Sequence, residues 1–229
     1  MGWYSKNMQF FQADASRGVG QLSDLLNQSL AANHRVLWLV SGGSNIPIEN
    51  KVMAALARDH LSNLTIMLTD ERYGDIGHAN SNAQQLIAAG FSPKQAIFIP
   101  VLINQSLELT AARYNRLVSQ QLERNQITIG QLGIGEDGHT AGILPNSLAA
   151  TVSDSFVAYY PAQDFSRITL TFPALRLITT AIVFAYGAGK QTALKQLKDE
   201  DLPLEVQPAQ ILKAIPSTYI YNDELEGET

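Results

Sequence analysis

The residues best suited to chemistry in this sequence lie in the stretch GEDGH, residues 135–139. His139 is the candidate general base, because imidazole is the side chain whose ordinary pKa lies near neutrality. Asp137, two residues earlier, could orient the ring and stabilise its protonated form. The glycines allow close backbone approach, and their N–H groups could serve a developing oxyanion. The stretch therefore predicts a site that activates water, although a histidine in a surface loop would leave the same pattern.

A second candidate is the glycine loop SGGSN at residues 41–45. Ser41, Gly42, Gly43 and Ser44 fall between an apolar, strand-like run and a helix-like segment. Glycine N–H groups and the N-terminus of a helix both favour an anion, so the loop could cradle a phosphate. An ordinary tight turn with serine as the helix N-cap explains the pattern equally well. The spacing matches neither the P-loop nor the dinucleotide-binding fingerprint.

Charged side chains at three other places could complete an anion site. Asp70, Glu71 and Arg72 follow an apolar run, where they could equally be plain solvated residues. Arg72 could hold a phosphate or carboxylate through its planar fork. Arg167 opens the run RITLTF, and Lys190 follows a Gly-Ala-Gly turn. Together the three cations would supply the positive charge that an anionic substrate needs in a chain of formal net charge −5.

Composition argues against several other classes of protein. The chain has 229 residues and no cysteine, which excludes disulfides, thiolate nucleophiles and cysteine-ligated metals. Its four histidines lack ligand spacing, so no metal site is predicted. There is no long basic run and no apolar run of membrane-spanning length, so neither nucleic acid nor membrane is an expected partner. No secretory signal is recognised, and a cytoplasmic location is expected. A serine-hydrolase elbow, G-x-S-x-G, is absent.

The elements that must carry these residues alternate between strand and helix. Apolar runs predict strands at 35–40, 64–70, 96–101, 127–135, 156–161, 167–172, 180–187 and 217–222. Helical spacing marks 19–32, 48–61, 83–90, 106–125 and a segment that starts near Lys190. The alternation predicts a single α/β domain over residues 1–229, with a mostly parallel, Rossmann-like sheet flanked by helices on both faces. Ligands bind beyond the carboxyl ends of such strands, where three of the candidate motifs fall.

The candidate motifs, in their order along the chain, resemble those of 6-phosphogluconolactonases. The matching blocks are SGGS (41–44), DER (70–72), SN (81–82), GIGEDGHTA (133–141), Pro145, RITLT (167–171) and GAGK (187–190). Glucosamine-6-phosphate deaminases of the same superfamily resemble the chain in the glycine loop and the GxGxDGH block. Deaminases usually have tyrosine where this chain has Arg72, and a glutamate where it has Leu144. Both differences favour the lactonases.

The resemblance implies a sugar-phosphate isomerase-like fold and hydrolysis of 6-phosphoglucono-δ-lactone in the oxidative pentose phosphate pathway, without cofactor or metal. It implies His139 as the base, with Asp137 beside it, and Arg72 as a group that orients the lactone. The residues implied in binding the sugar phosphate are Ser41, Gly42, Gly43, Ser44, Asp70, Arg167 and Lys190. A deaminase-like enzyme and a non-catalytic sugar-phosphate-binding protein stay as alternatives, and a monomer or small homo-oligomer is expected.

Overall fold

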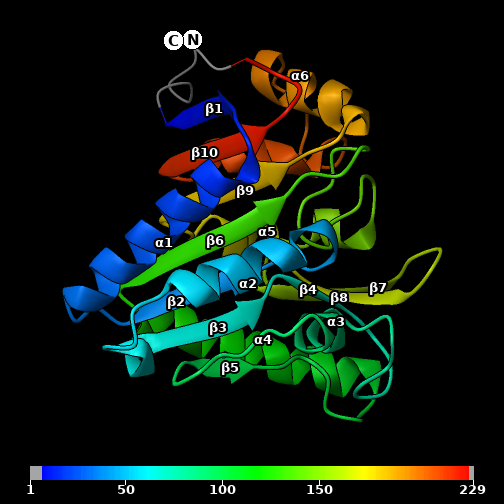
Figure 1. Cartoon of the computed structure of the whole chain (residues 1–229). Coiled ribbons are helices and arrows are strands. Elements are labelled where there is room, and N and C mark those ends of the chain that lie inside the picture. Colours follow the sequence, from blue (N-terminus) through cyan, green and yellow to red (C-terminus); the bar gives the residue numbers. More distant parts are fainter. Residues whose placement is uncertain (1–6, 227–229) are drawn as a thin grey trace.

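The computed structural model describes residues 7–226 and contains a large parallel sheet (Figure 1). In spatial order its strands are β1 (Met8–Gln12), β10 (Ser217–Asn222), β9 (Thr180–Ala185), β6 (Ile127–Gly133), β2 (Val36–Val40), β3 (Leu64–Leu68) and β5 (Ile97–Ile99). All neighbouring strands run parallel. The predicted α/β class with a mostly parallel sheet is therefore confirmed.

Helices cover both faces of this sheet, which explains why its inner strands are mostly apolar. Every residue of β2 and β3 is buried. The helices are α1 (Ala15–Ala31), α2 (Ile46–Ala55), α3 (Asn82–Ala88), α4 (Leu107–Arg124), α5 (Phe172–Leu175) and α6 (Gln191–Asp199). In Figure 1, α1 and α2 cross the near face of the sheet, whereas α4 and α5 lie behind it. None of the helices described is both long and apolar enough to cross a membrane.

Local sequence signals account for where several helices begin and end. Asp14, Ser81 and Ser106 accept hydrogen bonds from backbone N–H groups in the first turns of α1, α3 and α4. The helix predicted over 48–61 is wrong at its C-terminal end, because α2 stops at Ala55. Leu56 leaves the helix in an extended conformation and is buried in the core.

Short 3₁₀ segments connect the longer elements. They occupy Gly43–Asn45, Leu61–Asn63, Leu148–Thr151, Ala188–Lys190 and Pro208–Ala214. The first of them forms part of the glycine loop, and the fourth carries Lys190. Two of the candidate binding segments are therefore tight turns that lead directly into helices α2 and α6.

A second, antiparallel sheet of three strands lies beyond the carboxyl ends of the parallel strands in Figure 1. It consists of β4 (Asp70–Arg72), β8 (Ser166–Leu170) and β7 (Val157–Pro161). The Asp-Glu-Arg cluster was expected at the end of a buried strand. It instead forms the separate strand β4, because its backbone pairs with β8. This small sheet brings residues 70–72 and 166–170 together at the edge where ligands are expected.

Candidate active site

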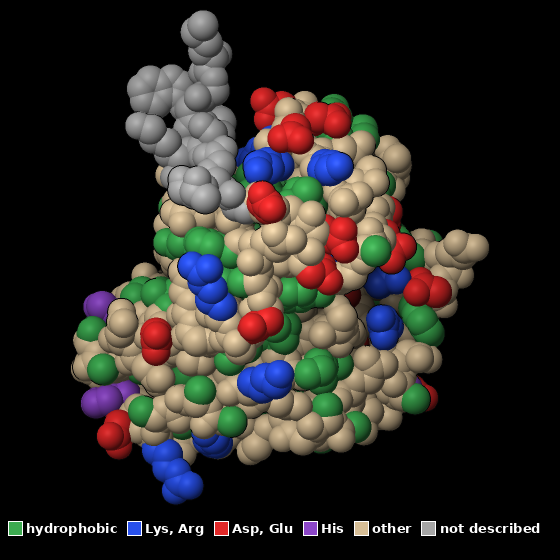
Figure 2. Space-filling view, turned by 45° about the horizontal axis from the view of Figure 1, so that its top comes forward, with side chains coloured by type: hydrophobic (Ala, Val, Ile, Leu, Met, Phe, Trp, Pro, Cys, Tyr) green, Lys and Arg blue, Asp and Glu red, His purple; other side chains and the backbone are tan. Residues whose placement is uncertain are grey.

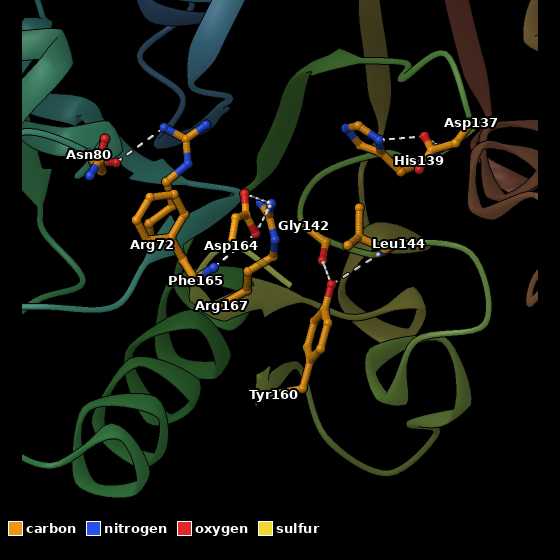
Figure 3. Close-up of polar contacts among 10 residues, drawn as sticks. All are labelled: Arg72, Asn80, Asp137, His139, Gly142, Leu144, Tyr160, Asp164, Phe165 and Arg167. Carbon is orange, nitrogen blue, oxygen red and sulfur yellow. Dashed lines mark hydrogen bonds and ion pairs between the residues drawn. The ribbon is translucent and has the colours of Figure 1, made fainter. Parts of the chain in front are cut away.

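The loop after β6 holds the imidazole of His139 in contact with Asp137 (Figure 3). Nδ1 lies 2.6 Å from Oδ1 of Asp137, and the same oxygen accepts the backbone N–H of His139 at 3.1 Å. The hydrogen bond from the ring lowers the pKa of Asp137 to about 2. An ionised carboxylate can only accept, so Nδ1 carries the ring proton and Nε2 keeps its lone pair. The pair therefore presents a nitrogen that can take a proton from water.

The glycines of this loop leave room for the functional side chains. A Cβ atom on Gly135 would overlap Nδ1 of His139. A Cβ atom on Gly189 would likewise overlap the carboxylate of Glu136. The second contact shows that the turn carrying Lys190 packs against the GEDGH loop. Close approach was predicted for the glycines around His139, and Gly189 adds a contact that joins two of the candidate motifs.

The small sheet places Arg72 directly opposite Arg167, and Asp70 opposite Thr169. Because side chains alternate along a strand, these four residues share one face of the sheet. Asp70 is buried, and burial raises its pKa, while Arg167, Arg72 and His139, in that order, act to lower it. The charges of the two arginines and of the imidazole therefore all act on one buried carboxyl group.

Glu71 points to the other face of the small sheet and holds the N-terminus of α3. Its Oε1 accepts the backbone N–H groups of Asn82 at 2.6 Å and Arg72 at 2.8 Å. Its Oε2 accepts the hydroxyl of Ser81 at 3.0 Å and the N–H of Ala83 at 3.1 Å. Burial raises the pKa of this carboxyl, and the four hydrogen bonds oppose that effect. The alternative that this cluster is simply solvated is wrong, and Glu71 serves the fold.

Ser41 and Gly42, the inner half of the glycine loop, have structural roles. The buried hydroxyl of Ser41 donates to the backbone carbonyl of Gln131 at 3.0 Å. A Cβ atom on Gly42 would overlap the side-chain amide of Asn82. That amide donates to the backbone carbonyl of Asp70 at 3.0 Å. Although Ser41 was expected to bind substrate through this loop, its side chain links β2 to β6, and Gly42 brings the loop against α3.

The outer half of the loop is open. Gly43 has φ +65° and nothing within 4 Å of a Cβ placed on it, and Ser44 is exposed. The alternative reading, in which a serine caps α2, is wrong, because the N-cap is Asn45 and it makes no side-chain capping bond. Among the predicted loop residues, Gly43 and Ser44 are therefore the ones that a ligand can reach.

Tyr160, which the sequence analysis assigned only to a strand, anchors the segment that follows His139 (Figure 3). Its buried hydroxyl donates to the carbonyl of Gly142 at 2.7 Å and accepts the N–H of Leu144 at 3.4 Å. Thr169 accepts the N–H of Gly142 at 2.9 Å. The small sheet thus fixes both the arginines and the chain that leads away from the histidine.

A second missed contributor is Gln207, in the segment before β10. Its side chain packs against Gly138, which has φ +81°, and its amide donates to the carbonyl of Ala193 at 2.8 Å. The N–H of Ala209 donates to the carbonyl of Gly138 at 2.9 Å. A lone glutamine between prolines carries no motif, so only the tertiary structure reveals that it supports the GEDGH loop.

Within residues 7–226, no group of three or more acidic or histidine side chains is arranged to hold a metal. An open hollow of about 430 Å³ has none of the predicted residues in its lining, which consists of Gln12, Ala13, Asp14, Ala15, Tyr186 and Asp223. Figure 2 shows basic side chains scattered among acidic ones over the face in view, with no continuous basic area there.

The glycine loop, the paired Asp137 and His139 and most of the parallel sheet lie within a region that matches a known protein family. Residues 12–220 match the family described as glucosamine-6-phosphate isomerases/6-phosphogluconolactonase, and the chain belongs to this family. The resemblance found in the sequence is thereby confirmed.

Individual relatives narrow the comparison. The chain is 30% identical to a 6-phosphogluconolactonase of Bos taurus, over 74% of this chain and 73% of the relative. It is 26% identical to a glucosamine-6-phosphate deaminase of Staphylococcus epidermidis, over 88% of this chain and 90% of the relative. The crystal structure of a 6-phosphogluconolactonase from Shewanella baltica superposes with a TM-score of 0.81 at 20% identity, covering 95% of this chain and 98% of the other. This last likeness shows the shared fold.

Proposed function

We propose that this chain hydrolyses 6-phosphoglucono-δ-lactone to 6-phosphogluconate, a step of the oxidative pentose phosphate pathway. The observation that carries the proposal is the hydrogen-bonded Asp137 and His139 pair, which has a free Nε2 and whose imidazole, like the two arginines, acts on the buried Asp70. Membership of the family and the identity to the Bos taurus lactonase support the choice of substrate. A small sugar phosphate as partner, a cytoplasmic location and a single domain over residues 1–229 stay predictions.

In the proposed reaction, Nε2 of His139 takes a proton from water as the water oxygen bonds to the lactone carbonyl carbon. The carbonyl electrons move onto oxygen, and Arg72 together with backbone N–H groups stabilises this oxyanion. The oxyanion then collapses, the bond from the carbonyl carbon to the ring oxygen breaks, and the ring oxygen receives the proton held by His139. Asp137 stabilises the imidazolium between the two transfers.

The phosphate of the substrate would bind where cations and free N–H groups meet. We assign it to Arg167 and Lys190, together with the backbone of Gly43 and Ser44. Asp70 was predicted to bind substrate, but its exposed fraction is 8%. We propose that the main role of Asp70 is to hold the side chains of Arg72 and Arg167 at their positions in the site.

The test is a fast coupled assay on freshly generated lactone, since the lactone also hydrolyses spontaneously. His139→Ala should lower turnover roughly 10²–10⁴-fold, the usual contribution of a positioned general base. His60→Asn is the matched control, because His60 is exposed and lies just before β3, at the amino end of that strand. Near-wild-type turnover in His139→Ala would remove the histidine from the mechanism.

The deaminase alternative is tested with the same protein. Leu144 stands where deaminases usually carry a glutamate, so we expect no ammonia release from glucosamine 6-phosphate. Ammonia release without lactone hydrolysis would decide for a deaminase-like enzyme. Tight binding of 6-phosphogluconate without turnover of either substrate would instead identify a sugar-phosphate-binding protein.

A further inference from the structure

The turn between β7 and β8 contacts both arginines of the site (Figure 3). Nη2 of Arg167 lies 3.0 Å from Oδ1 and 2.9 Å from Oδ2 of Asp164. The ring of the next residue, Phe165, lies 5.9 Å from the guanidinium carbon of Arg72. Asp164 and Phe165, two successive residues of one turn, therefore contact the two arginines that the proposed function assigns to the substrate.

The geometry of the ion pair leaves much of the Arg167 guanidinium unused. A single nitrogen serves both carboxylate oxygens of Asp164, so the contact is end-on. Arginine binds phosphate more strongly through two parallel N–H···O bonds. Nε of Arg167 is buried and, within the described chain, has no hydrogen-bond partner. A phosphate that accepted hydrogen bonds from two nitrogens of the guanidinium would thus make a contact that Asp164 does not make.

The acid can also be released at little cost. The Asp164 side chain is 49% exposed, whereas that of Arg167 is 14% exposed. The N–H of Phe165 and the charge of Arg167 lower the pKa of Asp164 against the effect of its partial burial. Asp164 is therefore a charged group whose oxygens return readily to water. Because one partner of this ion pair is half exposed to water, its loss should change binding only severalfold.

We propose that Asp164 is an internal counter-ion that competes with the substrate phosphate for Arg167. Binding then exchanges one protein carboxylate for one phosphate, and the exchange weakens every anion at this position by the same factor. The inference rests on the proposed function only in taking Arg167 as the phosphate ligand. The opposite role, in which Asp164 positions Arg167 for the ligand, predicts an effect of opposite sign.

The test measures binding of inorganic phosphate and of 6-phosphogluconate by calorimetry for wild type and Asp164→Asn. Removing the competitor should tighten both ligands equally, by roughly two- to fivefold. In the lactone assay, KM should fall with kcat unchanged. Asp154→Asn is the control. Asp154 is an exposed acid just before β7, at the other end of that strand from Asp164. Its replacement changes the net charge by the same amount as Asp164→Asn.

Four outcomes would overturn the inference. They are weaker or unchanged phosphate binding in Asp164→Asn, an equal gain in Asp154→Asn, unequal gains for the two ligands, and no measurable phosphate binding in either protein. A failure of the proposed function looks different. In that case the wild type would not hydrolyse the lactone, while Asp164→Asn would still bind phosphate more tightly.

Discussion

Replacing Asp137 separates two contributions that its carboxylate makes to His139. The pKa of Asp137 is about 2 against an ordinary 3.8, which corresponds to about 2.5 kcal/mol of interaction. The side chains of His139 and Asp137 are 38% and 50% exposed, and solvent screening reduces the useful part to about 1 kcal/mol. Asp137→Asn removes this charge but keeps an oxygen where Oδ1 accepts both N–H groups. We therefore expect kcat/KM to fall about fivefold.

Asp137→Ala removes the acceptor as well, so the ring loses its orientation and its fixed proton position. A misplaced catalytic group costs on the order of 10²-fold, and this variant should lose about that much. Both variants are compared in the lactone assay with Asp59→Asn, an exposed acid near the amino end of β3. Equal losses in Asp137→Asn and Asp137→Ala would refute the division into charge and orientation. Wild-type turnover in Asp137→Asn would show that the charge has no part in catalysis.

Three further predictions concern packing, pH and binding. Gly135→Ala should lower turnover strongly, because its methyl group would overlap the ring of His139. Gly20→Ala is the control, because its methyl group meets open space and full activity is expected. The lactone assay compares the two variants. Burial raises the pKa of Glu49 well above its ordinary value, so wild type loses stability as pH rises above about 4.5. Glu49→Gln should be more stable than wild type by about 1 kcal/mol or more at pH 8 and equal to it near pH 4, and urea unfolding at the two pH values checks this. Lys190→Ala should raise KM more than it lowers kcat, whereas an unchanged KM would remove this residue from the phosphate site.

Local sequence patterns predicted most of the parallel sheet, because buried parallel strands are short continuous apolar runs. They did not predict β1 (Met8–Gln12), an edge strand only partly buried, whose pairing with β10 joins opposite ends of the chain. They identified 156–161 and 167–172 as strands but not the separate sheet that these form. That sheet depends on pairing with Asp70–Arg72, and three charged residues carry no strand signal of their own.

In the site, too, local contacts could be predicted from the sequence, whereas contacts between distant segments could not. Asp137 and His139 are two residues apart, so their contact could be read from the sequence. The position of Arg72 opposite Arg167 results from strand pairing between residues 95 positions apart in the chain, which no local pattern encodes. Tyr160 and Asp164 contribute through a backbone contact and a turn, and neither belongs to a recognisable motif.

Strand β8 joins the part of the site that holds the phosphate to the part that attacks the lactone. In the proposed enzyme Arg167 binds the phosphate, and Thr169, two residues on, accepts the backbone N–H of Gly142, just beyond His139. Two residues of a strand span about 7 Å, and an extended strand cannot stretch further. In the proposed enzyme β8 therefore fixes the spacing between the phosphate-binding residue and the catalytic loop. We therefore expect a sugar lactone whose phosphate is one carbon nearer to the carbonyl to be a poorer substrate.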